Sequence, residues 1–259
     1  MERYSELIEL PSQGRLYGDK LPGGEIEIYA MGAEEEAILI NKSKQESSRA
    51  LDRLIERCIK TDFPSEELLI SDRLYIFLMM RKISYGDAYK YKIKCPHCGF
   101  SFMHEISIPG SFMVTLLDEG VKEPFYVDLP RCKKRIGFKL LRASDEKDAQ
   151  MYIRNQNRSN KSSDADPGYL YRLAKHMISI DDIPEEGKEA SITSVGIVDA
   201  LTFVKTMIGM DSSKFKDAIA DNDCGIDLRM DVECNSGSCG EEFKASLEFT
   251  AEFFRPESD

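Results

Sequence analysis

Two pairs of closely spaced cysteines constrain the fold of this chain more than any other feature of its sequence. Four of the seven cysteines form these pairs, namely Cys95, Cys98, Cys234 and Cys239. A glycine follows each pair, which lets the backbone amides turn toward the sulfur atoms. Tetrahedral structural zinc needs four converging ligands, and thiolates on two tight turns supply them at C-x₂₋₄-C spacing. The sequence therefore predicts structural Zn²⁺ bound by these four cysteines, with unbound thiols as the alternative.

Alternating apolar and polar residues flank both cysteine pairs and predict two β-hairpins. Residues 89–94 alternate up to the first pair, and residues 100–108 alternate after it. Residues 226–233 and 243–249 follow the same pattern around the second pair. A period of two is typical of half-buried strands. Each cysteine pair is therefore expected at the tip of a hairpin, and two such hairpins can pack side by side.

The remaining segments complete a predicted α+β fold. Apolar stripes predict helices over residues 47–59 and 72–83. Phe249 continues a strand pattern and is expected in the core, whereas Phe253 and Phe254 either close the core or anchor in a neighbouring protein. The expected parts are an extended N-terminal arm at 1–24, a helical N-terminal part at 25–86, a zinc-ribbon-like hairpin module at 87–108 with 225–250, an inserted region at 109–224 and a C-terminal tail at 251–259.

The inserted region between the hairpins is predicted to begin with strands and to continue as helices. The strand candidates are residues 125–129 and 135–141. Ser144 can cap the first helix of this region. Apolar stripes predict further helices over 169–177, 195–207 and 215–219. The polar stretch at 155–168 has no apolar period, so we expect a mobile loop there or a loop that only a partner orders.

Composition limits the classes of function that this chain can have. It has 259 residues and a formal net charge of −11, from 35 Lys and Arg against 46 Asp and Glu. The length is sufficient for a substantial core, which argues against general disorder. The negative charge repels a phosphate backbone, so nucleic-acid binding is disfavoured. We find neither an apolar run long enough for a bilayer nor a signal-peptide pattern, and we expect a cytosolic protein made in a reducing compartment.

The unpaired cysteines and the histidines are expected to be packing or surface residues. The unpaired cysteines are Cys58, Cys132 and Cys224. Cys58 belongs to the apolar face of a predicted helix, where a free cysteine packs as a small hydrophobe. His97 is expected to be exposed inside the first turn, His104 to be partly buried on a strand, and His176 to lie on a helix surface.

We find no constellation of residues that predicts catalysis. Phosphate-binding loops, nucleophile elbows and metalloprotease motifs are missing from the sequence. The clusters Glu34–Glu36 and Asp181–Asp182 are interpreted as first turns of helices and solvated faces. Cys95-Pro-His-Cys98 is similar to a thiol redox turn, but a strand follows it where that chemistry wants a helix. The lysines at 90, 92 and 94 alternate with tyrosines, so they lie on a solvated strand face and do not form a nucleic-acid stripe.

The order and spacing of several motifs resemble the baseplate proteins of contractile-tailed phages of the T-even type. The likeness covers nearly the whole chain and is strongest over residues 8–99 and 225–256. The motifs that carry it are Ile8–Tyr17, Gly24–Ile28, Met31 with Ala33–Leu39, Leu68–Leu74, Ile83–Gly86, Lys94–Gly99, the second cysteine turn and Phe253–Pro256. The resemblance implies a small protein of the baseplate hub region that is needed for hub assembly and carries no enzymatic activity.

The resemblance also indicates partners and location. We expect a structural or assembly component of the tail baseplate that contacts other baseplate, hub and tail proteins. No nucleic acid, membrane or small-molecule substrate is expected. The protein is expected in the host cytoplasm during assembly and then in the virion tail baseplate, either as a retained subunit or as an assembly chaperone. The alternatives are a zinc-ribbon protein that binds nucleic acid and a thiol redox protein.

Overall fold

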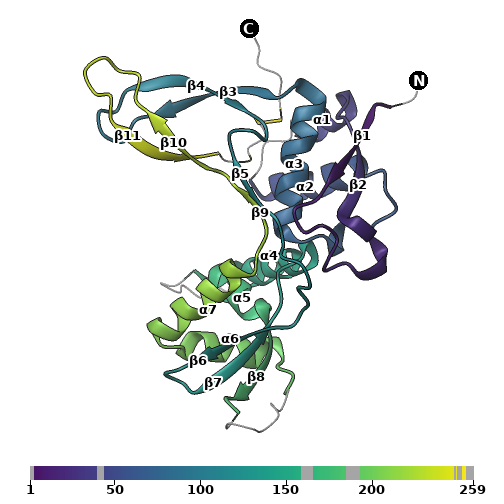
Figure 1. Cartoon of the computed structure of the whole chain (residues 1–259), viewed down its shortest axis with the longest axis vertical. Coiled ribbons are helices and arrows are strands. Elements are labelled where there is room, and N and C mark those ends of the chain that lie inside the picture. Colours follow the sequence, from purple (N-terminus) through teal and green to yellow (C-terminus); the bar gives the residue numbers. More distant parts are fainter. Residues whose placement is uncertain are drawn as a thin grey trace. The chain divides into compact units, whose positions relative to one another are not determined.

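The computed structural model contains helices and small antiparallel sheets in two compact units (Figure 1). It describes residues 3–39, 44–158, 166–184, 193–247, 249, 253 and 254. Unit 1 comprises Met1–Ser65, Ser71–Leu116 and Cys224–Asp259, and unit 2 comprises Glu66–Ile70 and Leu117–Asp223. The predicted mixture of helix and sheet is confirmed. No helix among the described residues is both long and apolar enough to cross a membrane.

Unit 1 begins with a short antiparallel sheet and a compact turn. Strand β1 (Ser5–Glu9) pairs with β2 (Glu25–Tyr29). Between them lie the 3₁₀ turns η1 (Gly18–Lys20) and η2 (Pro22–Gly24). The prediction of an extended arm at 1–24 was wrong for the described part of this segment, because four of its apolar side chains are buried. These side chains are Ile8, Leu10, Tyr17 and Leu21.

A buried carboxylate explains why this N-terminal segment packs. Asp72, in the first turn of helix α3 (Ile70–Tyr85), is fully buried. It accepts hydrogen bonds from the backbone N–H of Ser12 at 3.0 Å and the hydroxyl of Tyr17 at 2.5 Å. A buried carboxylate requires such partners. Asp72 therefore joins two segments that carry the family resemblance, although they are far apart in sequence.

The helices of unit 1 follow the predicted apolar stripes. Helix α1 (Ala33–Leu39) precedes α2 (Lys44–Cys58), which has Leu54, Ile55 and Cys58 on its buried face. Helix α3 is buried around most of its circumference, as a helix with apolar residues on several faces must be. Its buried apolar residues are Ile76, Phe77, Leu78, Met79 and Met80.

Strands with a period of two form the second half of unit 1. Strand β3 (Ala88–Lys94) pairs with β4 (Ser101–Ser107), and β10 (Arg229–Glu233) pairs with β11 (Glu242–Ser246). Both predicted hairpins are confirmed as strand pairs. A further antiparallel pair joins β5 (Met113–Thr115) to β9 (Gly225–Asp227). The term zinc-ribbon-like remains a prediction.

Aromatic residues near the C-terminus belong to the core of unit 1. Phe253 and Phe254 are fully buried. The ring of Phe254 lies 5.7 Å from that of Phe77, and the ring of Phe253 lies 5.1 Å from that of Tyr89, both edge-on. Phe249 packs on Phe253 and remains partly exposed. The two alternatives for the Phe253–Phe254 pair thus resolve in favour of the core.

Unit 2 combines one three-stranded antiparallel sheet with four described helices. The strands lie in the order β6 (Phe125–Leu129), β7 (Lys134–Phe138) and β8 (Met177–Asp182). Phe138 on β7 packs edge-on against Phe215 at 5.6 Å, and both are fully buried. The helices are α4 (Ala143–Arg158), α5 (Pro167–His176), α6 (Ile197–Thr206) and α7 (Gly209–Asp221).

Three details of unit 2 differ from the sequence prediction. Helix α4 begins at Ala143, so Ser144 lies inside it, and the helix extends to Arg158. The predicted loop at 155–168 is therefore helical at its start. It is also helical at its end, where Asp166 caps α5 by accepting a hydrogen bond from the N–H of Gly168 at 2.8 Å. Residues 159–165 lie outside the described residues. The apolar stripe assigned to a helix up to 177 ends at His176, where β8 begins.

Candidate metal centre

The two hairpin tips of unit 1 position the paired cysteines. In the first, the β3–β4 ladder ends at Lys94 opposite Ser101, and the N–H of Cys95 donates to the carbonyl of Phe100 at 2.8 Å. In the second, the N–H of Cys234 donates to the carbonyl of Glu241 at 3.0 Å. The first cysteine of each pair thus directly follows a regular ladder and is held by one further backbone hydrogen bond. A rigid strand therefore fixes its direction.

Glycines with positive φ close both turns. Gly99 has φ +75° and donates its N–H to the carbonyl of Cys95 at 3.0 Å. Gly240 has φ +64° and directly follows Cys239. Residues with a side chain rarely adopt this left-handed conformation. The predicted role of a glycine after each pair therefore has a conformational reason in both turns.

The four predicted sulfur ligands converge on one point. Their Sγ atoms all lie within 4.8 Å of one another, and Sγ of Cys98 is 3.7 Å from Sγ of Cys234. A disulfide requires a separation of about 2.05 Å, and all of these cysteines are free. A tetrahedral site with Zn–S bonds of about 2.3 Å places its sulfurs roughly 3.8 Å apart. Small adjustments would bring the present arrangement to that geometry.

The four thiols of the cluster affect one another's ionisation. Burial opposes ionisation of Cys95, but the backbone N–H groups of Cys98 and His97 and the neighbouring sulfurs outweigh it and lower its pKa to about 7. The N–H of Ser236 favours the thiolate of Cys234, yet burial and the sulfur neighbours raise its pKa to about 12. Several thiolates at this separation repel one another. A divalent cation at the centre would allow all of them to ionise.

The donor set fits zinc better than a harder ion. Within the described part of the chain, this is the only group of three or more potential ligands, and it contains neither histidine nor carboxylate. Soft thiolates select zinc and similar ions over magnesium or calcium. Cys95 and Cys234 are buried, whereas Cys98 is exposed. His97 is exposed, as predicted, and is outside the cluster.

The unpaired cysteines have separate surroundings. Cys58 is fully buried, as predicted, and burial raises its pKa to about 11. Cys224 is buried with its sulfur 3.6 Å from the hydroxyl of Ser71. Cys132 is partly exposed, and its pKa is raised by burial and by Asp211. Cys58 and Cys132 therefore favour the neutral form, which is a poor nucleophile.

A second polar cluster in unit 1 was not expected from the sequence. Glu35 lies in the first turn of α1, as predicted. It is not solvated, however, because its side chain is only 3% exposed and forms ion pairs with Arg3 at 3.0 Å and Arg57 at 2.8 Å. It also accepts a hydrogen bond from the N–H of Gly32 at 3.0 Å. Burial opposes the charge of Glu35, but these partners, Arg57 foremost, lower its pKa. The carboxylate is therefore a structural anchor.

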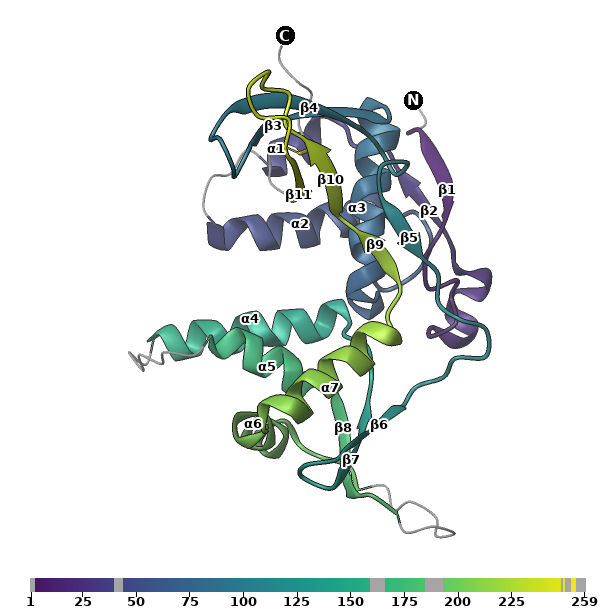
Figure 2. The ribbon, with the colours of Figure 1, turned by 60° about the vertical axis from the view of Figure 1, so that its left-hand side comes forward.

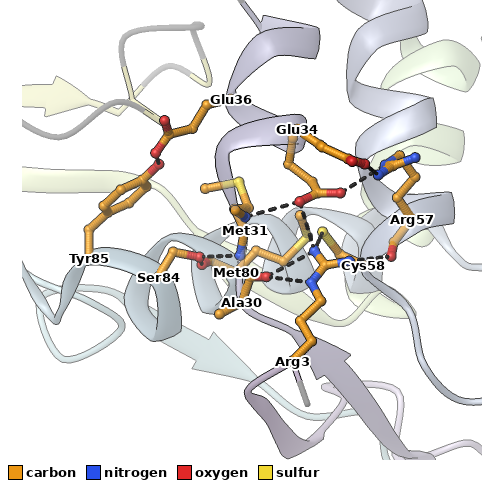
Figure 3. Close-up of polar contacts among 12 residues, drawn as sticks. Arg3, Ala30, Met31, Glu34, Glu36, Arg57, Cys58, Met80, Ser84 and Tyr85 are labelled. Carbon is orange, nitrogen blue, oxygen red and sulfur yellow. Dashed lines mark hydrogen bonds and ion pairs between the residues drawn. The ribbon is translucent and has the colours of Figure 1, made fainter. Parts of the chain in front are cut away.

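Hydrogen bonds and ion pairs in this cluster connect Arg3, which precedes β1, to helices α1 and α2, and connect α1 and the segment before it to α3 (Figure 3). Arg3 donates two hydrogen bonds to the carbonyl of Ala30, at 3.0 and 2.9 Å, and one to Sγ of Cys58 at 3.5 Å. On α3, Ser84 accepts a hydrogen bond from the N–H of Met31 at 2.8 Å, and Tyr85 donates to Glu36 at 2.5 Å. These contacts hold the N-terminal segment and helices α1, α2 and α3 together.

The other residues that the sequence singled out differ in their burial. His176 was expected on a helix surface, but burial lowers its pKa and its Nδ1 lies 2.7 Å from the carbonyl of Lys139. His104 is partly buried, as predicted. Asp181 was expected to be solvated, but it is buried on β8. The lysines of β3 at 90, 92 and 94 are exposed on one face, as the alternation predicted.

Comparison with known proteins identifies a family. A family model described as T4 bacteriophage base plate protein matches residues 6–255, nearly the whole chain. The match includes both cysteine pairs and both structural units. It confirms the resemblance that the motifs indicated. No curated protein and no solved structure matches the chain.

Proposed function

The chain belongs to the T4 bacteriophage base plate protein family, and from this membership we propose that it is a structural or assembly component of the baseplate hub. Membership implies a structural role in the tail and contacts with other tail proteins. The finer proposal is that the protein acts through these contacts alone, without catalysing a reaction. The observation that carries it is the family match across both units.

The architecture of unit 1 supports a role in assembly. Segments that carry the family motifs contact one another, as when Asp72 binds Ser12 and Tyr17. Polar residues of such motifs in enzymes typically converge on an open pocket that also holds perturbed acids and bases. Here Asp72 and Glu35 are buried and hydrogen-bonded to the protein itself. The motifs maintain a shape, which is what a subunit of a larger assembly needs.

We further propose that Cys95, Cys98, Cys234 and Cys239 bind one structural zinc ion. The ion would supply folding free energy, because its ligands lie in segments that are distant in sequence and meet only in the folded chain. The backbone hydrogen bonds of the chain itself form the two cysteine turns, so the ion would join the turns to each other. The zinc-ribbon-like arrangement of residues 87–108 with 225–250 is part of this proposal.

Analysis of tail intermediates and finished particles tests the proposed function. In phage that lacks the gene, we expect baseplates that fail to assemble around a hub, and complementation by the intact chain should restore them. Mass spectrometry of purified virions then separates a retained subunit, present at fixed stoichiometry, from an assembly factor, present only in intermediates. Normal tails in the absence of the gene would refute a hub function.

Two substitutions test whether the protein acts through protein contacts or through thiol chemistry. Lys92→Glu reverses a charge on the exposed face of β3 without touching a buried contact. Cys132→Ser removes the most exposed thiol outside the metal cluster. If the protein acts through structure alone, Cys132→Ser should complement fully. Loss of tails with a stably folded Cys132→Ser protein would point to thiol chemistry and contradict the proposal.

A further inference from the structure

A cavity in unit 1 lies beside the edges of two strands. Its volume is about 530 Å³, within the usual range of ligand sites. Consecutive residues of β4 line one side and residues of β9 and β10 line the other. Neighbouring residues along a strand point to opposite faces. A cavity that touches several in succession therefore borders the edge of the strand, where backbone groups are accessible.

The hydrogen-bond pattern identifies which backbone groups of β10 point into this space. Bonds from Cys234 to Glu241 and from Leu247 to Leu228 bracket the β10–β11 ladder. Antiparallel pairs alternate between bonded and non-bonded positions. Residues 228, 230, 232 and 234 therefore bond to β11, and Arg229 and Asp231 direct their backbone groups away from it. The N–H of Arg229 is bonded to Asp227, but the N–H of Asp231 has no partner among the described residues.

Strand β9, which precedes β10 in the chain, already has a partner strand. Strand β5 pairs with β9, with Met113 opposite Asp227 (Figure 2). Before Met113 the chain turns away through Ser111, which itself lines the cavity. Strand β10 begins two residues after the end of β9, with Leu228 between them. Strand β5 therefore begins opposite Asp227 and does not extend alongside β10. Among the described strands, β10 pairs only with β11, so its other edge beside Asp231 has no partner strand.

The side chains around the cavity define the chemistry of an occupant. Ile106, Met113 and Met230 supply apolar surface, and Met113 is 69% exposed. The charged groups neutralise one another in the pairs Lys90–Glu105 at 3.3 Å, Arg229–Asp227 at 2.8 Å and Lys244–Asp231 at 3.8 Å. An apolar centre with a balanced polar rim is the usual anatomy of a protein interface. It favours an uncharged segment with an apolar anchor.

From this geometry we infer that the cavity is a docking site for an extended, uncharged peptide segment of another tail protein. The segment adds as a strand to the free edge of β10, in line with β5, and places an apolar side chain against Met113 and Met230. Main-chain hydrogen bonds to Asp231 give affinity, and the apolar pocket gives specificity, as in other cases of strand addition. The identity of the partner as a tail protein rests on the proposed function.

Photo-crosslinking in assembled tails tests this inference. A photoreactive amino acid replaces Met113 in one phage and Met103 in another. Met103 is a matched control, because it is 58% exposed on β4 and is outside the cavity lining. We expect position 113, but not position 103, to crosslink to one segment of a different tail protein. Crosslinks from position 113 only to a second copy of this chain, or to no protein, would overturn the inference.

A synthetic peptide of the crosslinked segment then tests the mode of binding to the intact, purified chain. We expect hydrogen exchange at the amide of Asp231 to slow at least tenfold, while that of Met103 is unchanged. Met113→Asp should weaken peptide binding at least tenfold without altering the melting temperature. Binding with no protection at Asp231 would refute strand addition. Presence of the protein in normally assembled tails without any crosslink would refute the docking site and leave the hub function intact.

Discussion

The two units differ in how distant parts of the chain are held together. Unit 1 gathers three separate segments, and its described strands form two-stranded sheets. Isolated pairs of strands are marginally stable. Unit 2 is almost continuous in sequence and has a three-stranded sheet with the fully buried Phe138 and Phe215. Both units have an apolar core, and we expect the polar contacts of Asp72 and Glu35, together with the proposed metal site, to add cross-links between the separate segments of unit 1.

Removal of a metal ligand should have the largest effect, and it should be confined to unit 1. Structural zinc contributes about 10–16 kcal/mol of apparent binding free energy in small zinc domains. We therefore expect Cys95→Ser, or a strong chelator, to lower the stability of unit 1 by more than about 3 kcal/mol. Metal analysis should find one zinc per parent chain and less in the variant. Amide exchange should accelerate in unit 1 and remain unchanged in unit 2.

Cys132→Ser is the control for this experiment, because Cys132 lies in unit 2 and outside the cluster. It should retain the metal and the parent melting temperature. A parent protein that contains no metal, together with a Cys95→Ser variant that melts like the parent, would show that the thiols are unbound. Unit 1 would then require another explanation for its stability.

Truncation of a buried apolar side chain in unit 2 should destabilise unit 2 and leave unit 1 unchanged. Phe215→Ala removes a fully buried ring that packs on Phe138. Such substitutions cost about 3–5 kcal/mol. Amide exchange should accelerate in unit 2 and not in unit 1, and the metal content should be unchanged. Phe100→Ala, which truncates an exposed ring in unit 1, is the matched control and should change stability by at most about 0.5 kcal/mol.

The buried acid of unit 1 should have a smaller effect that depends on pH. Glu35→Gln removes the charge that Arg3 and Arg57 pair with, and both arginines retain access to water. We therefore expect a loss of about 2 kcal/mol, less than for a fully buried pair. Because the pKa of Glu35 is lowered in the fold, its contribution is present above about pH 4.5 and is lost as the pH falls through the folded pKa.

Urea unfolding at two pH values measures this contribution. The difference in stability between parent and Glu35→Gln should be full at pH 7 and should shrink toward pH 3. Glu34→Gln is the control, because Glu34 pairs with the same Arg57 but is 81% exposed. It should cost at most about 0.5 kcal/mol. An equal effect of both variants would mean that the burial of Glu35 is unimportant.

The fold features that depend on contacts between neighbouring residues could be predicted from the sequence, and those that depend on contacts between distant segments could not. The two hairpins and the helices α2 and α3 were predictable, because period and turn residues are local properties. The convergence of four thiols was predictable from their spacing and their glycines. The packing of residues 3–24 was not, because it depends on Asp72, a carboxylate in a different part of the sequence.

Polar residues at buried positions account for the other differences. On β8, Ser179 and Asp181 are buried while Ile178 and Ile180 are partly exposed. This inverts the usual pattern and concealed the strand. Glu35 looks like its neighbours Glu34 and Glu36 in the sequence, and only the positions of Arg3 and Arg57 distinguish it. Such pairings become visible when the tertiary structure brings the partners together.

Two glycine substitutions give the smallest and most selective comparison of the units. Gly240 in unit 1 has φ +64°, and Gly209 at the start of α7 in unit 2 has no positive φ. An added Cβ would meet nothing within 4 Å at either position, so the backbone conformation alone decides the change in stability.

We expect Gly240→Ala to lower the stability of unit 1 by about 1 kcal/mol and to weaken the proposed zinc binding, because alanine disfavours the left-handed conformation that closes the cysteine turn. Gly209→Ala should stabilise unit 2 by about 0.4–1 kcal/mol, because alanine restricts the unfolded chain. Calorimetry of both variants checks the opposite signs, and a stabilising Gly240→Ala would show that the turn does not hold its cysteine in this conformation.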